Sequence, residues 1–100
     1  MKLELVKVIV KLVGVLRGLA RKENLVVESE IPNVREVVLM LIEEVGSGQF
    51  QRIVWNSESN SPAPSLIVLV NGRDVGLLGG SDAHLRDGDE LVLISASHGG

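Results

Sequence analysis

The architecture follows from the stretch Leu66-Ile67-Val68-Leu69-Val70-Asn71-Gly72. Its first five residues are all apolar, which predicts a strand that is buried on both faces of a sheet. The Asn-Gly pair that follows is the strongest short signal for a tight turn. Residues 90–95, Glu-Leu-Val-Leu-Ile-Ser, predict another strand of this kind, because positions 91–94 are again apolar.

The first part of the chain predicts a hairpin. Across residues 6–12 the even positions are apolar and two of the three odd positions are lysine, which indicates a half-buried strand. Residues 25–27 form a second short apolar run, which predicts its hairpin partner. Residues 6–20 could be mistaken for a signal peptide or a membrane anchor. We expect neither, because three charges interrupt the apolar run: Lys7, Lys11 and Arg17.

One amphipathic helix is predicted between the two pairs of strands. Pro32 and Asn33 predict its start, because proline presets φ and asparagine accepts hydrogen bonds from free N–H groups of the first turn. Apolar residues then recur at steps of three and four from Val34 to Val45, as on one face of a helix. Gly46 predicts its end.

Residues 46–65 are rich in glycine, serine, asparagine and proline, and they predict a long loop. Phe50 and Trp55 are the only aromatic residues of the chain and lie within this loop. We expect them to attach the loop to the body of the domain, rather than to serve in recognition.

A single helix covers only one face of a small sheet, so strands that are apolar on both faces leave one apolar face uncovered. Alternation predicts four residues on the helix side: Ile67, Leu69, Leu91 and Leu93. It leaves Val68, Val92 and Ile94 on the uncovered face, where we expect a partner-docking patch, because exposed apolar patches are usually interfaces. The alternative is that the 46–65 loop folds over that face.

Composition bounds the class of protein. The chain has 100 residues, 45% apolar and 23% charged, which is enough for one compact domain with its own core. The net charge is -3 and the basic residues are spread along the chain, so neither nucleic acid nor a membrane is an expected partner. The absence of cysteine excludes disulfides and thiol catalysis, and it fits a reducing compartment, so a cytoplasmic location is expected.

The end of the sequence, Ser97-His98-Gly99-Gly100, predicts a reactive tip. Two terminal glycines arise by chance in roughly 0.5% of chains. Without a Cβ atom, the last two peptide units can thread a channel that is too narrow for other residues. The ionised α-carboxyl group is a poor electrophile until a second protein activates it. The alternative is an ordinary frayed terminus.

These features together resemble the ubiquitin-like sulfur carriers of the MoaD and ThiS group. The resemblance rests on the β-β-α-β-β order and on four short segments: Val70-Asn71-Gly72, Leu78-Gly79-Gly80, the turn at residues 85–90 and Gly99-Gly100. It is close over residues 66–100 and looser before them, where residues 16–20 look like the loop after the first strand. The histidine before the two glycines is most similar to the ubiquitin-related modifier branch.

The resemblance implies an α+β, ubiquitin-like β-grasp fold with a four- to five-stranded mixed sheet and one main helix. Residues 1–94 would form this domain, and residues 95–100 a flexible C-terminal tail. Extended, those six residues span roughly 20 Å, enough to reach into the active site of a partner.

The resemblance also implies a carrier protein that is a substrate and not an enzyme. An E1-like adenylating enzyme of the MoeB/ThiF type uses ATP to activate Gly100, and a persulfide-bearing protein converts the acyl-adenylate into a thiocarboxylate. The sulfur goes to tRNA, or through a molybdopterin-synthase large subunit to a cofactor precursor, and some members are joined to lysines of target proteins. Gly99 and Gly100 are then the activated end, Ser97 and His98 are recognised by the activating enzyme, and the chain itself binds no cofactor.

Two other kinds of site have candidate residues in the sequence. A metal site could be formed by five residues, Asp82, His84, Asp87, Asp89 and Glu90, but their spacing matches no EF-hand loop and Asp-Gly-Asp is ordinary turn chemistry. The glycines of residues 72–80 do not have the spacing of a phosphate loop. The alternative functions are a non-catalytic β-grasp interaction module with an incidental diglycine end, and a small catalytic subunit that uses His84 or His98.

Overall fold

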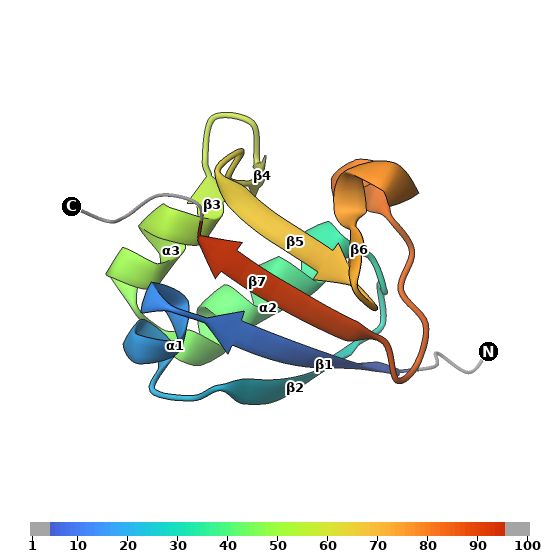
Figure 1. Ribbon diagram of the computed structural model, residues 1–100, viewed down its shortest axis with the longest axis horizontal. Coiled ribbons are helices and arrows are strands. Elements are labelled where there is room, and N and C mark those ends of the chain that lie inside the picture. Colours follow the sequence, from blue (N-terminus) through green and yellow to red (C-terminus); the bar gives the residue numbers. More distant parts are fainter. Residues whose placement is uncertain (1–4, 96–100) are drawn as a thin grey trace.

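The computed structural model describes residues 5–95 and contains a five-stranded mixed sheet with α-helices packed on one side of it (Figure 1). The strands of this sheet are β1 (Val6–Val13), β2 (Asn24–Ser29), β5 (Leu66–Val70), β6 (Arg73–Asp74) and β7 (Glu90–Ser95). The helices are α1 (Val15–Ala20), α2 (Val34–Val45) and α3 (Gly48–Val54), with the 3-10 helices η1 (Val75–Leu78) and η2 (Gly80–Asp82). A separate two-stranded sheet consists of β3 (Trp55–Asn56) and β4 (Ser61–Pro62). Over residues 5–95, no helix is long and apolar enough to cross a membrane.

Strand β7 occupies the middle of the sheet, whose order is β2-β1-β7-β5-β6. It runs parallel to β1 on one side and antiparallel to β5 on the other, while β1 and β2 form an antiparallel hairpin. The predicted hairpin and the strands at residues 66–70 and 90–95 are confirmed, and β6 adds a fifth strand. The first and last strands of the chain are therefore neighbours, and the C-terminal end of β7 lies beside the end of β1 that leads into α1 (Figure 1).

The predicted turn after β5 is confirmed and is attached to the start of β7. Asn71 and Gly72 have φ angles of 50° and 83°, the left-handed backbone that a tight hairpin turn of this kind requires at both central positions. The Asn71 side-chain amide donates to Asp89 Oδ1 at 2.9 Å, and its Oδ1 accepts from the Glu90 N–H at 2.9 Å. One side chain thus holds the β5–β6 turn against the first residue of β7.

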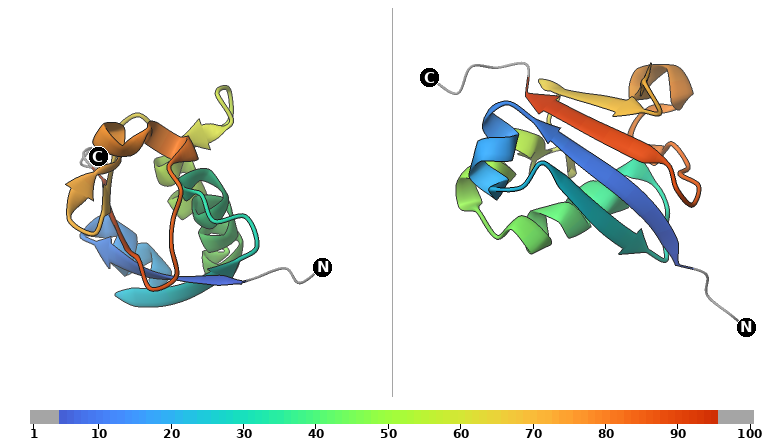
Figure 2. Two further views of the ribbon diagram at one scale, coloured as in Figure 1. Left: turned by 90° about the vertical axis from the view of Figure 1, so that its right-hand side faces the viewer. Right: turned by 60° about the horizontal axis from the view of Figure 1, so that its bottom comes forward.

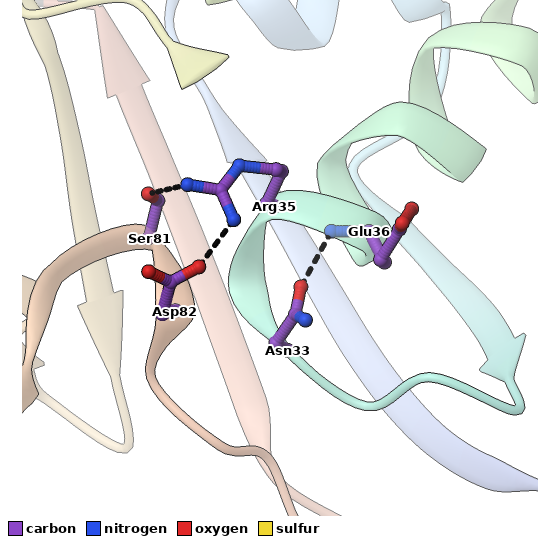
Figure 3. Close-up of polar contacts among 5 residues, drawn as sticks. All are labelled: Asn33, Arg35, Glu36, Ser81 and Asp82. Atoms are coloured by element: carbon purple, nitrogen blue, oxygen red, sulfur yellow. Dashed lines mark hydrogen bonds and ion pairs between the residues drawn. The ribbon is translucent and has the colours of Figure 1, made fainter. Parts of the chain in front are cut away.

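Helix α2 has the predicted bounds because both of its ends carry specific caps. Asn33 Oδ1 accepts a hydrogen bond from the Glu36 N–H at 2.8 Å (Figure 3), and Gly46 ends the helix with a left-handed φ of 69°. The guanidinium of Arg35 donates to Ser81 Oγ at 3.0 Å and forms an ion pair with Asp82. These contacts fasten η2 over the first turn of α2.

The core lies between the helices and one face of the sheet. The end-on view shows the helices on that side of the sheet (Figure 2). Strands β1 and β7 contribute fully buried side chains at alternate positions: Val8, Val10, Leu12, Leu91 and Leu93. Helix α2 contributes the predicted apolar stripe, of which the buried members are Val34, Val37, Val38 and Leu41. The apolar face of the sheet and the apolar stripe of α2 therefore pack together in a single core.

The prediction of a long loop over residues 46–65 is wrong. Its first part forms α3, which Ser47 caps by accepting from the Phe50 N–H at 3.1 Å, and its second part contains the β3–β4 pair. Phe50 is fully buried and Trp55 packs against the core, so the expected attachment through the aromatic residues is confirmed. Because α3 contacts α1 and α2, this segment lies on the helix side and does not cover the other face of the sheet. Two short helices, α1 and α3, thus accompany the main helix.

The two faces of strand β5 are the reverse of the predicted ones. We call the alternation of its side chains between the two faces of the sheet its phase. Val68 is 3% exposed and faces the helices, whereas Ile67 is 38% exposed on the other face. The predictions that Ile67 and Leu69 face α2 and that Val68 lies outside are therefore wrong. All five residues of β5 are apolar, so alternation along this strand alone cannot distinguish its faces. Pairing with β7 does, because Val68 lies opposite Leu93, and opposed residues of an antiparallel pair share a face.

The phase of β5 predicts unequal costs for two leucine truncations. Leu93→Ala removes a fully buried side chain, so we expect the free energy of unfolding to fall by about 2–5 kcal/mol. Leu69→Ala truncates a half-buried side chain on the other face and should cost less than half as much. Urea denaturation of both variants measures the difference, and equal losses would contradict the observed phase.

Candidate functional site

The candidate site begins where β7 ends. Ser95, its last residue, lies opposite Leu66 of β5, and Ile94 lies between Val13 of β1 and Ile67 of β5. Ser95 thus belongs to the strand, one residue beyond the predicted end of the domain. The predicted tail residues Ser97, His98, Gly99 and Gly100 lie outside the described residues. What the structure defines is the surface from which the tail continues.

That surface is the sheet face opposite the helices, and it carries an apolar patch over three neighbouring strands. We call it the outer-face patch, and its members are Ile9, Val13, Ile67, Leu69, Val92 and Ile94. Ile9, Val13 and Ile67 are 41%, 38% and 38% exposed, respectively. The members lie in rows across the strands. The first row, next to the end of β7, contains Val13, Ile94 and Ile67; the second contains Val92 and Leu69, and the third contains Ile9. A continuous apolar surface therefore adjoins Ser95, the last described residue.

Charged residues of both signs border the outer-face patch. Lys11 is the neighbour of Val92 in the second row, and Asp74 lies opposite Leu69. Glu90 is the neighbour of Ile9 in the third row. An apolar centre with a charged border is the usual composition of a protein-binding surface.

Of the three predicted patch residues, the structure places two on this face. Val92 and Ile94 are half-buried there, whereas Val68 lies in the core, as the phase of β5 requires. Ile67 and Leu69 take its place. Sequence reasoning also missed Ile9 and Val13, although Ile9 is the one odd position of residues 6–12 that is not lysine, which is a signal of an apolar outer face.

The acidic residues near the start of β7 are engaged in turn formation. Asp87 Oδ1 accepts from the Lys7 N–H and Asp89 Oδ2 from the Arg86 N–H, both at 2.8 Å. Gly88 between them has a φ of 87°, and its N–H donates to the Lys7 carbonyl. Within residues 5–95, no group of three or more His, Cys, Asp or Glu residues is arranged to hold a metal ion. These contacts fix the entry into β7.

Comparison with known proteins gives consistent results. Residues 7–100 match the family model described as Urm1 (Ubiquitin related modifier). Ubiquitin-related modifier 1 of Coprinopsis cinerea is 49% identical over 43 residues, which are 43% of this chain and 35% of that protein. The chain thus matches about a third of the length of this relative.

Two solved structures share the fold over nearly their whole length. Small archaeal modifier protein 1 from Methanosarcina acetivorans has a TM-score of 0.82 at 24% identity, with 97% of this chain and 99% of that chain covered. Urm1 from Trypanosoma brucei has a TM-score of 0.72 at 26% identity, with both chains covered completely. The expected α+β, ubiquitin-like β-grasp fold is confirmed.

The two faces of the sheet predict opposite responses to a negative charge. Val68→Asp places a carboxylate in the core without a partner, so we expect a loss of several kcal/mol or complete unfolding. Ile94→Asp places the same group on the outer face, and most of the thermal stability should remain. Thermal unfolding followed by circular dichroism measures both. Unfolding of the Ile94 variant would show that the outer face is buried in the protein.

Proposed function

Because the chain belongs to the Urm1 family of ubiquitin-related modifiers, we propose that it is a sulfur carrier and protein modifier activated at its C-terminal glycine. In this proposal the chain is a substrate, and an E1-like enzyme supplies the catalytic groups. The observation that carries the proposal is the position of β7: it bears two members of the outer-face patch, and in the sequence three residues separate its end from Gly99-Gly100. Binding and reaction are thus assigned to one strand and its extension.

The proposed reaction has three steps. The Gly100 carboxylate attacks the α-phosphate of ATP, and pyrophosphate leaves, which converts a poor electrophile into an acyl-adenylate. The terminal sulfur of a persulfide then attacks the Gly100 carbonyl carbon, and AMP leaves. A second thiol attacks the resulting acyl disulfide, so the products are the Gly100 thiocarboxylate and an ordinary disulfide. Attack by a lysine amine on the activated carbonyl would instead form an isopeptide bond with a target protein.

Glycine is suited to positions 99 and 100 for steric reasons. The nucleophile must reach the carbonyl of residue 100 inside an enclosed site, and a side chain on either terminal residue would narrow the approach. Five residues follow Ser95, and an extended chain of that length spans roughly 17 Å. That reach allows the outer-face patch to bind the surface of the activating enzyme while Gly100 enters its nucleotide site. The activating enzyme would recognise Ser97 and His98 between the patch and its nucleotide site.

The proposed sulfur acceptors are tRNA or a molybdopterin precursor, and the proposed conjugation targets are lysines of other proteins. The proposed compartment is the cytoplasm, because a chain without cysteine fits a reducing environment. Mass spectrometry of the protein from its native host tests the carrier role directly. A fraction that is heavier by the exchange of one oxygen for sulfur, or that is linked to lysine, is expected. A population with neither would favour a plain interaction module.

The first functional prediction concerns the terminal glycines. Deletion of Gly100, or Gly99→Val, should abolish ATP–pyrophosphate exchange by the cognate activating enzyme, because the reacting carboxylate is displaced or sterically blocked. Thermal unfolding should be unchanged in both variants, which serves as the control for folding. Exchange at the wild-type rate in the Gly100 deletion would contradict the proposed activation.

The second functional prediction concerns the outer-face patch. Ile94→Asp should weaken binding to the activating enzyme by more than about 2 kcal/mol, because the centre of an apolar interface tolerates a charge badly. Met40→Asp is the matched control, because Met40 is an exposed apolar residue on α2, on the opposite side of the sheet. Isothermal titration calorimetry compares the two variants. An equal effect of both, or of neither, would remove the patch from the proposed interface.

A further inference from the structure

Strand β2 has a free edge. Among residues 5–95, it is the terminal strand of the sheet and its one pairing partner is β1. The Leu12 N–H donates to the Glu23 carbonyl at 2.8 Å, which marks a hydrogen-bonded pair at one end of the β1–β2 ladder. Such pairs alternate with pairs that exchange no hydrogen bonds, and Ile9–Val26 is one of the latter. The Ile9 N–H accordingly donates toward β7, and the backbone groups of Val26 and Glu28 point to the open edge.

A pocket lies beside this edge, between the end of β2 and helix α2. Its volume is about 320 Å³, and its apolar lining comes from Leu5, Ile31 and Met40. These three side chains are 52%, 56% and 38% exposed. This apolar surface is separate from the outer-face patch, because α2 covers the opposite face of the sheet. The pocket has room for one aliphatic side chain from a bound molecule.

Carboxylates surround the pocket. Glu28, Glu30 and Glu36 line it, and none of them takes part in the ion pair found among residues 5–95, which joins Arg35 to Asp82. Lys7 lies opposite Glu28 in the hairpin, so its ammonium offsets part of that charge. Within the described residues 5–95, no ion pair joins Glu30 or Glu36 to a cation. The pocket therefore favours a ligand that is both apolar and positively charged.

We propose that the β2 edge and this pocket bind an extended segment of a partner protein in which aliphatic residues alternate with lysine or arginine. The backbone of the segment adds to the sheet through the free groups of Val26 and Glu28. Alternation along the added strand directs one aliphatic side chain into the pocket. The long, flexible lysine or arginine side chains next to it are proposed to reach Glu30 and Glu36 at the border of the pocket. The pocket lies outside the outer-face patch, whereas the side chain of Val26 lies beside Ile9 on that face. Binding at this edge does not depend on activation of Gly100.

A synthetic peptide tests the proposal on the full chain. The probe is the acetylated and amidated heptapeptide Lys-Val-Lys-Ile-Lys-Val-Lys, titrated into isotopically labelled protein and followed by amide chemical shifts. We expect the largest changes at Val26, Glu28, Ile31 and Met40. The double variant Glu30→Lys and Glu36→Lys should weaken binding at least about ten-fold, because both favourable charge contacts become repulsive.

The control is the double variant Glu43→Lys and Glu44→Lys, which makes the same change of net charge on exposed residues of α2 outside the pocket. It should weaken binding less than about three-fold, as expected for screened charges at a distance. Circular dichroism confirms that both double variants are folded. Equal weakening by the two would reduce the site to non-specific attraction and overturn the proposal.

Two further peptides test the mode of binding. A version with N-methyl groups on the central backbone amides should lose most of its affinity, since these amides pair with the sheet edge. Binding of that peptide at full strength would exclude strand addition. A version with glutamate in place of every lysine should not bind, and binding by it would exclude the charge complementarity. Shifts confined to Ile67, Val92 and Ile94 would assign the peptide to the outer-face patch instead and overturn the proposal.

Discussion

The central position of β7 is the constraint on which the structure depends. This strand pairs with β1 in parallel and with β5 antiparallel, so it joins the two halves of the chain into one sheet. Its Leu91 and Leu93 are fully buried against the helices. The last strand of the chain cannot detach without opening the core. The residues that follow β7 are therefore attached to a central strand of the sheet.

Coverage of the sheet on one side only is the second constraint. The helices α1, α2 and α3 gather on one face, and the aromatic anchor Phe50 brings residues 48–54 to that same side. The opposite face keeps an apolar surface whose border mixes lysine with carboxylates. A protein that acts through binding has a use for such a face, whereas an enzyme would also need converging catalytic groups. The candidate catalytic residue His84 is exposed, and the structure shows it pairing with Asn33 through the backbone.

The two binding surfaces proposed for this domain differ in physical character. The outer-face patch is broad, apolar and adjacent to the end of β7, which suits an enzyme that must also receive the tail. The β2 edge is linear and acidic, and it is separated from β7 by β1. A partner that binds through backbone pairing and charge needs little contact with the outer face. Under these two proposals, the activating enzyme and a second protein bind at separate places on the domain.

Local signals in the sequence were sufficient to predict several elements. Helix α2 was predicted to the residue because Asn33 and Gly46 act on the backbone next to them, and Asn71-Gly72 specified its turn for the same reason. Strand β1 was predicted from the alternation of lysine with apolar residues, and β7 from its apolar run. The resemblance to the family could be stated because it rested on short turn segments and a Gly-Gly pair that are read directly from the sequence.

Tertiary structure alone decided the rest. The five apolar residues of β5 have no polar member to mark a face, so the phase that buries Val68 came from pairing with β7. Helix α3 has only seven residues, too few for periodicity to stand out, and it is stabilised by burying Phe50 and Val54 in the core. The outer-face patch and the pocket beside β2 each combine residues that are far apart in the chain. The sequence determined which residues prefer to be buried or to turn, and the contacts between distant strands determined which faces those residues share.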